Sequence, residues 1–198
     1  MPKANRRPLI LASRSPRRRL LLKQIGLNFL VRPSTVDERF HDHESPRSGA
    51  LRIAEEKAMD VAGRFRRGIV VGADTIVVVG REVLGKPETK REARAMLRKL
   101  SGRTHIVYTA IVLVDVETKK KTSEVARTKV QFRKLTTEEI ALYAASGSPM
   151  DKAGAYGIQD DYGAVFVEKV DGCFYNVVGF PLSRFHRAYE KLLRELHR

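Results

Sequence analysis

The sequence is poor in cysteine and in aromatic residues. Its 198 residues include one cysteine, no tryptophan and 7% aromatic residues. A single cysteine, Cys173, excludes an internal disulfide and a cysteine-pair metal site. We therefore expect Cys173 to be a small core residue. The low aromatic content also argues against a domain that stacks nucleic-acid bases on aromatic side chains.

The sequence also lacks long apolar runs. No stretch approaches the roughly 18 uncharged apolar residues that a membrane-spanning helix needs. The apolar run near the N-terminus lies within basic residues and has no small-residue cleavage site. We therefore expect a cytoplasmic protein with no membrane partner. With 42% hydrophobic and 31% charged residues and no evident linker, the composition predicts a single folded domain over residues 1–198.

Acidic residues are fewer than basic ones. The chain carries 38 Lys and Arg against 23 Asp and Glu, a net charge of +15. Residues 1–68 contain 16 basic and 7 acidic side chains, so most of the excess lies in the first third. Such a charge favours polyanionic partners, namely nucleotide phosphates, nucleic acid or an anionic membrane. The alternative is a basic surface that is merely solvated.

Helix-start signals and apolar runs alternate along the chain. Ser15-Pro16, Ser45-Pro46 and the capping box of Thr136 with Glu139 each predict the beginning of a helix. Periodicity predicts helices over residues 16–25, 46–65, 88–100, 137–145 and 183–196. Apolar runs predict strands over residues 8–12, 27–31, 69–79, 82–84, 104–116, 123–132 and 164–170. This mixture indicates an α/β or α+β protein with a mixed sheet.

The first candidate site is residues 13–18, SRSPRR, between a predicted strand and a predicted helix. Free backbone N–H groups and the positive end of the helix dipole bind anions at such a position. Ser13 and Ser15 offer hydroxyl donors, and the guanidinium groups of Arg17 and Arg18 suit phosphate oxygens. The segment could thus bind a polyphosphate without a glycine-rich loop. The alternative is a capped surface helix with solvated arginines.

The second candidate site is Asp74, which interrupts an apolar, β-branched run. A carboxylate there is costly to bury unless it is paired or binds a metal ion, so we expect Asp74 in a cleft. The alternative is a strand end at a turn. Asp37-Glu38 adds a second acidic position on a polar loop, and Lys57 and Lys86 could add positive charge. Each of these residues alone is more often a solvated surface residue.

The third candidate site is residues 151–159, DKAGAYGIQ, which contain too much glycine for a helix. The glycines allow a close approach of the backbone to a ligand. Gln159 carries an amide that donates and accepts, as recognition of a base edge requires. The alternative is an ordered loop without a catalytic role. His41 and His43 are better interpreted as solvated loop residues than as metal ligands, and His105 needs no role.

These motifs, in this order, resemble the Maf (septum-formation protein) family of nucleotide pyrophosphatases. The match spans residues 9–183 and includes LASRSPRR at 11–18, VGADT at 71–75, GKP at 85–87 and VVGFP at 177–181. The resemblance implies an elongated, two-lobed α/β fold of the inosine-triphosphatase-like kind, with a mixed twisted sheet, flanking helices and a central cleft. It also implies hydrolysis between the α and β phosphates with a divalent cation, Mg, Mn or Co.

The resemblance assigns roles to individual residues. The family's catalytic aspartate falls on Asp74, and the positions that sort substrates fall on Arg17, Thr75 and Gln159, in a combination similar to the dTTP/UTP pyrophosphatase branch. Asp74 would accept a proton from water or bind the metal ion, and Glu38 would help to bind it. Which carboxylate does which stays open. The residues expected to bind the substrate are Ser13, Arg17, Arg18, Lys57, Lys86 and Lys152.

Two alternatives to this function stay open. A purine or inosine-type pyrophosphatase would catalyse the same reaction on other bases. A basic nucleic-acid-binding protein would explain the charge, but the sequence has no RNP-like, KH-like or helix-turn-helix signature. We expect a homodimer that hydrolyses dTTP, UTP and modified pyrimidine nucleotides in a house-cleaning role.

Overall fold

The computed structural model describes residues 7–41, 43–159 and 162–197. The chain forms two compact units. Unit 1 comprises Met1–Asp74, Thr109–Val125 and Gly179–Arg198, and unit 2 comprises Thr75–Tyr108 and Ala126–Val178. Both units are discontinuous in sequence because three long strands contribute residues to each of them. The single domain over residues 1–198 stays a prediction.

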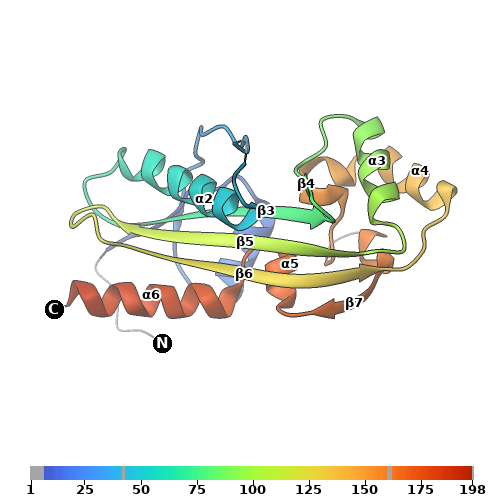
Figure 1. The fold of residues 1–198 in the computed structure, drawn as a ribbon. Helices are drawn as coiled ribbons and strands as arrows, with labels where there is room; N and C mark the ends of the chain where they lie inside the picture. The colour runs from blue at the N-terminus through green and yellow to red at the C-terminus, as the bar shows by residue number, and fades with distance from the viewer. Residues whose placement is uncertain (1–6, 42, 160–161, 198) are drawn as a thin grey trace. The chain divides into compact units, whose positions relative to one another are not determined.

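In the described residues, seven strands form one mixed sheet with flanking helices (Figure 1). The strands are β1 (Leu9–Leu11), β2 (Leu30–Val31), β3 (Ile69–Val79), β4 (Glu82–Leu84), β5 (Thr104–Asp115), β6 (Lys121–Phe132) and β7 (Val167–Asp171). Their order is β2-β1-β3-β5-β6-β7, and β4 pairs with β3. β1 is parallel to β2 and β3, whereas β4 and β7 are antiparallel to their neighbours. The predicted α/β class with a mixed sheet is confirmed.

Three of the helices begin at the caps that the sequence signals. The α-helices of the described residues are α1 (Pro16–Gln24), α2 (Pro46–Ala62), α3 (Lys90–Leu100), α4 (Thr137–Ala145), α5 (Phe174–Val178) and α6 (Leu182–Leu196). The side chains of Ser15, Ser45 and Thr136 each accept a hydrogen bond from the backbone N–H three residues later, which confirms the three predicted caps. None of the helices in these described ranges has the length and apolarity needed to cross a membrane.

Several predicted boundaries are wrong. The strand predicted over residues 164–170 begins only at Val167, because residues 162–166 form the 3₁₀ helix η3 (Tyr162–Phe166). Helix α5 was not predicted, since five residues are too few to show a helical period. The strand expected over residues 27–31 contains only two residues. Cys173, expected in the core, is half-buried.

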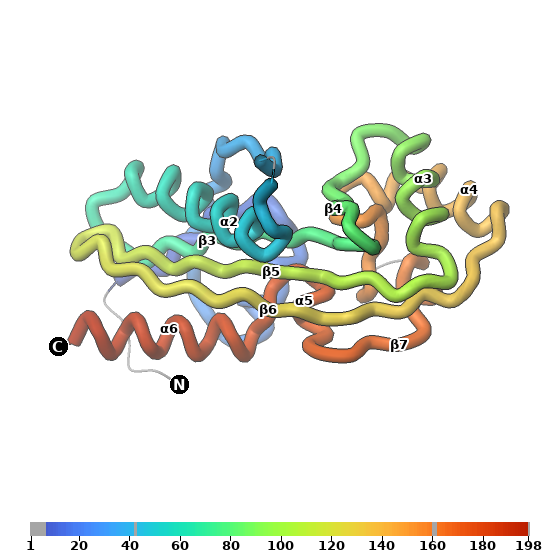
Figure 2. Tube along the Cα trace, in the orientation of Figure 1, coloured from blue at the N-terminus to red at the C-terminus, as the bar shows by residue number. Residues whose placement is uncertain are grey.

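Unit 1 is held together by a close contact between helix α2 and strand β3. A side chain at Gly72 would place its Cβ 2.1 Å from the carbonyl oxygen of Ala54 and 2.9 Å from Cβ of Ala58. Helix α2 can therefore approach the strand only because Gly72 has no side chain. Elsewhere in unit 1, α6 lies beside β6 (Figure 2). Lys120, just before β6, donates a hydrogen bond to the carbonyl of Glu195 at 2.6 Å.

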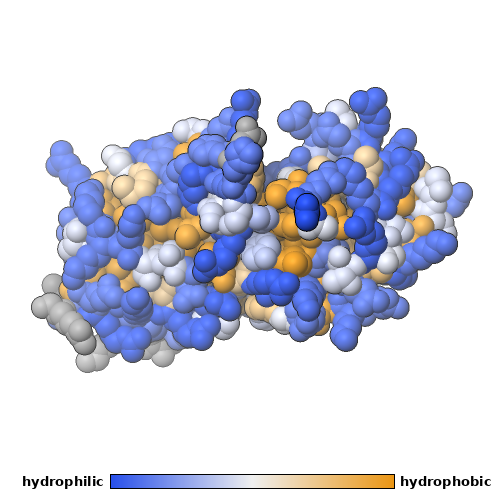
Figure 3. All heavy atoms as spheres, in the orientation of Figure 1, coloured by the Kyte–Doolittle hydropathy of each residue, from blue (hydrophilic) through white to orange (hydrophobic). Residues whose placement is uncertain are grey.

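Unit 2 has its own hydrophobic core. It is built from α3, α4 and the adjoining strands, and an aromatic group lies at its centre. The Phe132 ring packs edge-on against Tyr156, with centroids 4.7 Å apart, and against His105 at 5.0 Å. The face drawn in Figure 3 is covered mainly by hydrophilic residues, with hydrophobic patches between them.

Candidate active site

The loop between β1 and α1 places two serine hydroxyls at the beginning of a helix. The Oγ of Ser15 accepts a hydrogen bond from the N–H of Arg18 at 3.4 Å, and Oγ of Ser13 accepts one from the N–H of Ser15 at 3.2 Å. Pro16 occupies the first turn, where a missing N–H costs nothing. Both oxygens act as acceptors, so each hydroxyl keeps its own hydrogen to donate. The predicted strand, serine-containing loop and capped helix are therefore present, and anion binding at this helix N-terminus stays a prediction.

Arg18 is buried, contrary to the alternative of solvated arginines. Its Nη1 donates to Oγ of Ser13 at 3.1 Å and to the carbonyl of Ala73 at 2.8 Å, and its Nε donates to the carbonyl of Gly179 at 3.0 Å. Arg18 thus joins the helix start to the strand residue that precedes Asp74. Arg17 is half-buried, whereas Arg14 and Arg19 are exposed.

Asp74 lies in the middle of β3 and is paired. Its Oδ1 accepts a hydrogen bond from Nζ of Lys57 at 2.7 Å, and only 4% of the residue is exposed. The same Lys57 ammonium lies 2.8 Å from Oε1 of Glu38, whose side chain is 44% exposed. The alternative of a strand end is wrong, because β3 continues to Val79. Lys57, itself 5% exposed, is not a solvated surface residue.

The position of Lys57 follows from the packing of α2. The residues that α2 buries recur at helical spacing on the face that meets β3, and Lys57 shares that face with Ala54 and Ala58. The contact at Gly72 brings this face against the strand two residues before Asp74. An aliphatic lysine chain can lie buried along such a surface while its ammonium reaches a carboxylate.

The charges in this cluster influence one another. Burial lowers the pKa of the Arg18 guanidinium, whereas the nearby carboxylates of Asp74 and Glu38 raise it and Arg17 lowers it. Arg18 stays charged, because an arginine pKa lies far above neutral pH. Two cations, Arg18 and Lys57, therefore face two carboxylates in unit 1.

The two carboxylates fit a metal ion that is shared with a substrate. Oδ1 of Asp74 and Oε1 of Glu38 lie 2.7 and 2.8 Å from the same Lys57 ammonium, so the two carboxylates are close to each other. Magnesium is typically bound by one or two protein carboxylates together with substrate phosphates. Among the described residues, no group of three or more His, Cys, Asp or Glu could form a metal site by itself. A metal ion held by these two carboxylates would need further ligands, and the phosphates of a substrate could supply them.

Asp37 and the two loop histidines do not extend this cluster. Asp37 is 67% exposed and pairs with Arg39 at 3.0 Å. His41 and His43 are exposed, as expected of solvated loop residues. Asp42, between them, lies outside the described residues.

The remaining predicted site residues belong to unit 2. Thr75 follows Asp74 in β3 and is half-buried, whereas Lys86 and Gln159 are exposed on loops. Lys152 is 7% exposed, and its ammonium donates to the carbonyl of Ser148 at 2.6 Å and lies 3.0 Å from Oδ1 of Asp151. Their roles in binding substrate stay predictions.

Two of the predicted motifs meet within unit 2. The N–H of Gly154 donates to the carbonyl of Gly85 at 2.9 Å, which joins the DKAGAYGIQ segment to the GKP loop. A Cβ at residue 154 would lie 2.9 Å from the Val77 side chain. Gly154 also has φ of 70°, in the left-handed region that glycine adopts without strain. Residue 154 must therefore be glycine, because the backbone lies close to another part of the protein. The neighbour that it approaches is strand β3.

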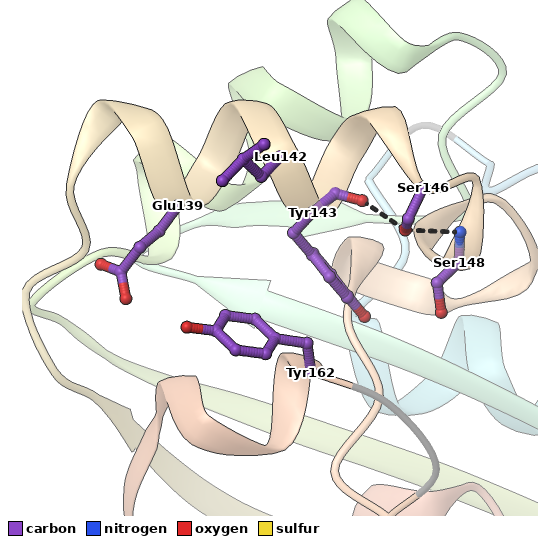
Figure 4. Close-up of a pocket in the computed structure, with 6 residues that line it drawn as sticks. All are labelled: Glu139, Leu142, Tyr143, Ser146, Ser148 and Tyr162. Atoms are coloured by element: carbon purple, nitrogen blue, oxygen red, sulfur yellow. Dashed lines mark hydrogen bonds between the residues drawn. The ribbon is translucent and has the colours of Figure 1, made fainter.

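Unit 2 also contains a pocket of about 500 Å³, whose described lining includes none of the predicted site residues but includes Ser148, the hydrogen-bond partner of Lys152 (Figure 4). Its described lining residues are Glu139, Leu142, Tyr143, Ser146, Ser148 and Tyr162. They include one carboxylate and no lysine or arginine, so the pocket does not suit a triphosphate. The polar cluster of unit 1 remains the candidate active site.

Residues 8–192 match the family model described as Maf-like protein. The chain belongs to this Maf-like family. The predicted resemblance is thereby confirmed over nearly the whole chain.

Relatives within the Maf-like family cover most of this chain. A protein of Syntrophomonas wolfei is 48% identical over 176 residues, which make up 89% of this chain and 93% of the relative. A protein of Carboxydothermus hydrogenoformans is 47% identical over 90% of this chain and 95% of its own length. A third, from Methanosarcina barkeri, is 45% identical over 93% of this chain and 94% of its own length. All three are named dTTP/UTP pyrophosphatase.

Sequence analysis missed some residues that shape the Maf-like site. The acceptors of Arg18 are the backbone carbonyls of Ala73 and Gly179, and a carbonyl has no sequence signature. Gly72, however, carried a usable signal, because a glycine inside a strand pattern indicates a close backbone approach. His105, to which no role was given, is 1% exposed and forms a hydrogen bond with Tyr156 at 2.8 Å.

Proposed function

We propose that this protein is a nucleoside triphosphate pyrophosphatase that hydrolyses dTTP and UTP to the monophosphate and pyrophosphate. The observation that carries the proposal is the buried pair of Lys57 from α2 and Asp74 from β3, joined by Glu38, in the unit that also holds the α1 N-terminus. Membership of the Maf-like family and relatives named dTTP/UTP pyrophosphatase support the same reaction.

The α1 N-terminus supplies the groups that bind phosphate. The hydroxyls of Ser13 and Ser15 donate to phosphate oxygens at the positive end of the α1 dipole. Arg17, half-buried beside them, adds positive charge. Arg18 acts as a fixed charge, because its Nε and Nη1 are bound to protein oxygens and cannot move far. Fixed positive charge stabilises the negative charge that develops on a leaving pyrophosphate.

Asp74 is the group that activates water. Lys57 binds Oδ1 of Asp74, so the second oxygen, Oδ2, is the one available to a water molecule or a metal ion. Asp74 accepts the proton as the water oxygen attacks the α phosphorus, and the bond from that phosphorus to the bridging oxygen breaks. A bound divalent cation, with Asp74 and Glu38 as ligands, would supply charge neutralisation and lower the pKa of water. Lys57 holds the two carboxylates close together.

Product analysis tests the proposal. Purified protein with dTTP or UTP and Mg²⁺, Mn²⁺ or Co²⁺ should release one monophosphate and one pyrophosphate per triphosphate, and EDTA should abolish the release. In ¹⁸O-labelled water, the label should enter the monophosphate, since the attack is at the α phosphorus. Diphosphate and orthophosphate as products, or label in the pyrophosphate, would contradict the assigned bond cleavage.

The setting of the enzyme is part of the proposal. We place it in the cytoplasm, where nucleoside triphosphates are made and consumed, and we expect it to act as a homodimer. Its role there would be to remove dTTP, UTP or modified pyrimidine nucleotides from the pool. Size-exclusion chromatography with light scattering would test the dimer.

A further inference from the structure

A short segment of unit 2, residues 154–157, is attached to its surroundings at three successive points. Gly154 donates its N–H to the carbonyl of Gly85 at 2.9 Å. The Tyr156 hydroxyl forms a hydrogen bond with Nε2 of His105 at 2.8 Å. The N–H of Gly157 donates to the Tyr143 hydroxyl at 3.3 Å. We call residues 154–157 the anchored segment.

The anchors come from three different elements. His105 lies in β5, Tyr143 lies in α4, and Gly85 follows β4. Tyr143 projects from α4 in Figure 4, where it also lines the pocket of unit 2. The Tyr156 ring packs edge-on against the rings of Phe132 and His105, with centroid distances of 4.7 and 5.4 Å. Attachment to three elements fixes both the position and the direction of the segment.

The hydrogen bond between His105 and Tyr156 joins two neutral groups. Burial lowers the pKa of His105 to about 4. Burial also raises the pKa of the Tyr156 phenol, so that it keeps its proton. Neither group changes charge near neutral pH, so titration does not break this hydrogen bond there.

Gln159 lies two residues beyond the last anchor. Ile158 is half-buried, and Gln159 is exposed. Two residues of extended chain span at most about 7 Å, so Gln159 stays close to the anchored segment, and a shift of Tyr156 or Gly157 changes the position of the Gln159 amide. A hydrogen bond between that amide and a base edge is lost after a shift much smaller than about 7 Å, because it depends closely on the donor–acceptor distance.

We propose that His105, Tyr143 and Tyr156 are positioning residues that set pyrimidine discrimination by fixing the segment that carries Gln159. None of the three needs to touch the substrate. The inference rests on the proposed function and on the expected role of Gln159, and it extends them to residues in the interior of unit 2.

The test is a substrate panel on two tyrosine variants. Tyr156→Phe keeps the ring and removes the hydroxyl that binds His105, and Tyr143→Phe removes the acceptor of the Gly157 N–H. Each should raise KM for dTTP about 10-fold, as the loss of a supporting hydrogen bond commonly does, with little change in kcat. The ratio of kcat/KM for dTTP to that for CTP should fall by a similar factor. An unchanged ratio in both variants would overturn the inference.

A double-mutant cycle separates positioning from mere stability. In a Gln159→Ala background, Tyr156→Phe should cause no further fall in the dTTP to CTP ratio, because the effect acts through Gln159. Val130→Ala, a core truncation in β6, should lower Tm and leave the ratio as in the wild type. If Tyr156→Phe does not fold, the dTTP to CTP ratio of Tyr143→Phe alone tests the inference. A wild-type protein that releases no pyrophosphate from dTTP would instead contradict the proposed function.

Discussion

Nζ of Lys57 lies 2.7 Å from Oδ1 of Asp74, and each of the two side chains is 6% exposed. Removing one partner of such a buried pair leaves an uncompensated charge and typically costs about 3–5 kcal/mol. Lys57 has a second partner in Glu38, at 2.8 Å, but Glu38 is partly exposed to solvent. The stability of β3 and the reactivity of Asp74 therefore depend on the same ammonium group.

Replacing Asp74 with asparagine should remove activity and preserve the fold. Asparagine has nearly the same volume as aspartate, and its amide oxygen could still accept a hydrogen bond from Lys57. It could not accept a proton or bind a metal ion as a carboxylate does, so turnover should fall at least about 100-fold. Steady-state kinetics with dTTP and a thermal melt would measure both effects. Turnover close to that of the wild type, at an unchanged Tm, would remove Asp74 from the mechanism.

Asp37→Asn is the matched control for this variant. Asp37 is an aspartate adjacent to Glu38, but it is 67% exposed and pairs with the exposed side chain of Arg39. Exposed ion pairs contribute little to the free energy of unfolding. Turnover and Tm should both stay at the wild-type level.

Gly72→Ala should separate α2 from β3. The new Cβ would lie 2.1 Å from the backbone oxygen of Ala54 and 2.8 Å from the nitrogen of Ala58, so the helix must move. We expect a loss of about 2–4 kcal/mol in the free energy of unfolding, as for severe overpacking of a core. Because Lys57 moves with α2, kcat should fall as well. Denaturant unfolding and kinetics measure the two effects, and full stability with full activity would contradict this account of Gly72.

Gly63→Ala is the control for the same helix. Gly63 caps the C-terminus of α2 with φ of −63°, and a Cβ there would come no closer than 3.7 Å to the Met59 carbonyl. Alanine fits this conformation, and reduced freedom of the unfolded chain should leave stability equal or raise it by about 0.5 kcal/mol.

The stability of the protein should fall between pH 6.5 and pH 4 because of His105. Burial lowers its pKa from 6.5 in the unfolded chain to about 4 in the folded one. The unfolded state therefore binds more protons in this interval, and stability that is fully present above pH 6.5 is lost as the pH falls through 4. The full contribution is roughly 3 kcal/mol. His105→Gln should show a smaller decrease in denaturant unfolding between pH 7 and pH 4, and an equal decrease in both proteins would contradict the assignment.

The parts of the fold that were predicted from sequence are those specified locally. Ser15, Ser45 and Thr136 mark helix starts because each cap is formed by residues within three positions of one another. The region from residue 146 to 178 was predicted poorly. Its 3₁₀ helices and the five-residue α5 are too short to show a helical period of apolar residues. Packing against the core of unit 2 determines their conformation instead.

For the site, residue identities were easier to predict than their partners. Asp74 stood out because a carboxylate in an apolar strand needs a partner, but that the partner is Lys57 depends on how α2 packs against β3. Arg18 was expected at the phosphate, and its bonds to two backbone carbonyls depend on segments 55 and 161 positions away. Contacts over such distances carry no local pattern.

Gln159→Glu should weaken the hydrolysis of dTTP and UTP more than that of CTP. Thymine and uracil present an acceptor, a donor and an acceptor, and a glutamine amide can pair with that pattern. A glutamate only accepts, so one acceptor of the base loses its donor, and the carboxylate would suit the amino group of cytosine. kcat/KM for the three triphosphates measures the change, and an equal loss for all three would show that Gln159 does not discriminate between bases.

The unmutated enzyme should prefer dTTP and UTP over CTP and the purine nucleotides. Cytosine has an amino group at C4 and no proton at N3, so a site built for thymine and uracil leaves groups unpaired. One buried unpaired group costs about 1–3 kcal/mol, a penalty of roughly 5- to 150-fold in kcat/KM. A purine would also have to fit a site sized for one ring. The measurement is pyrophosphate release across dTTP, UTP, CTP, ATP, GTP and ITP at equal metal concentration. Equal kcat/KM for UTP, CTP and GTP would overturn the base preference and leave the pyrophosphatase reaction standing, because the phosphate-binding groups of α1 and the Lys57–Asp74 pair do not depend on the base.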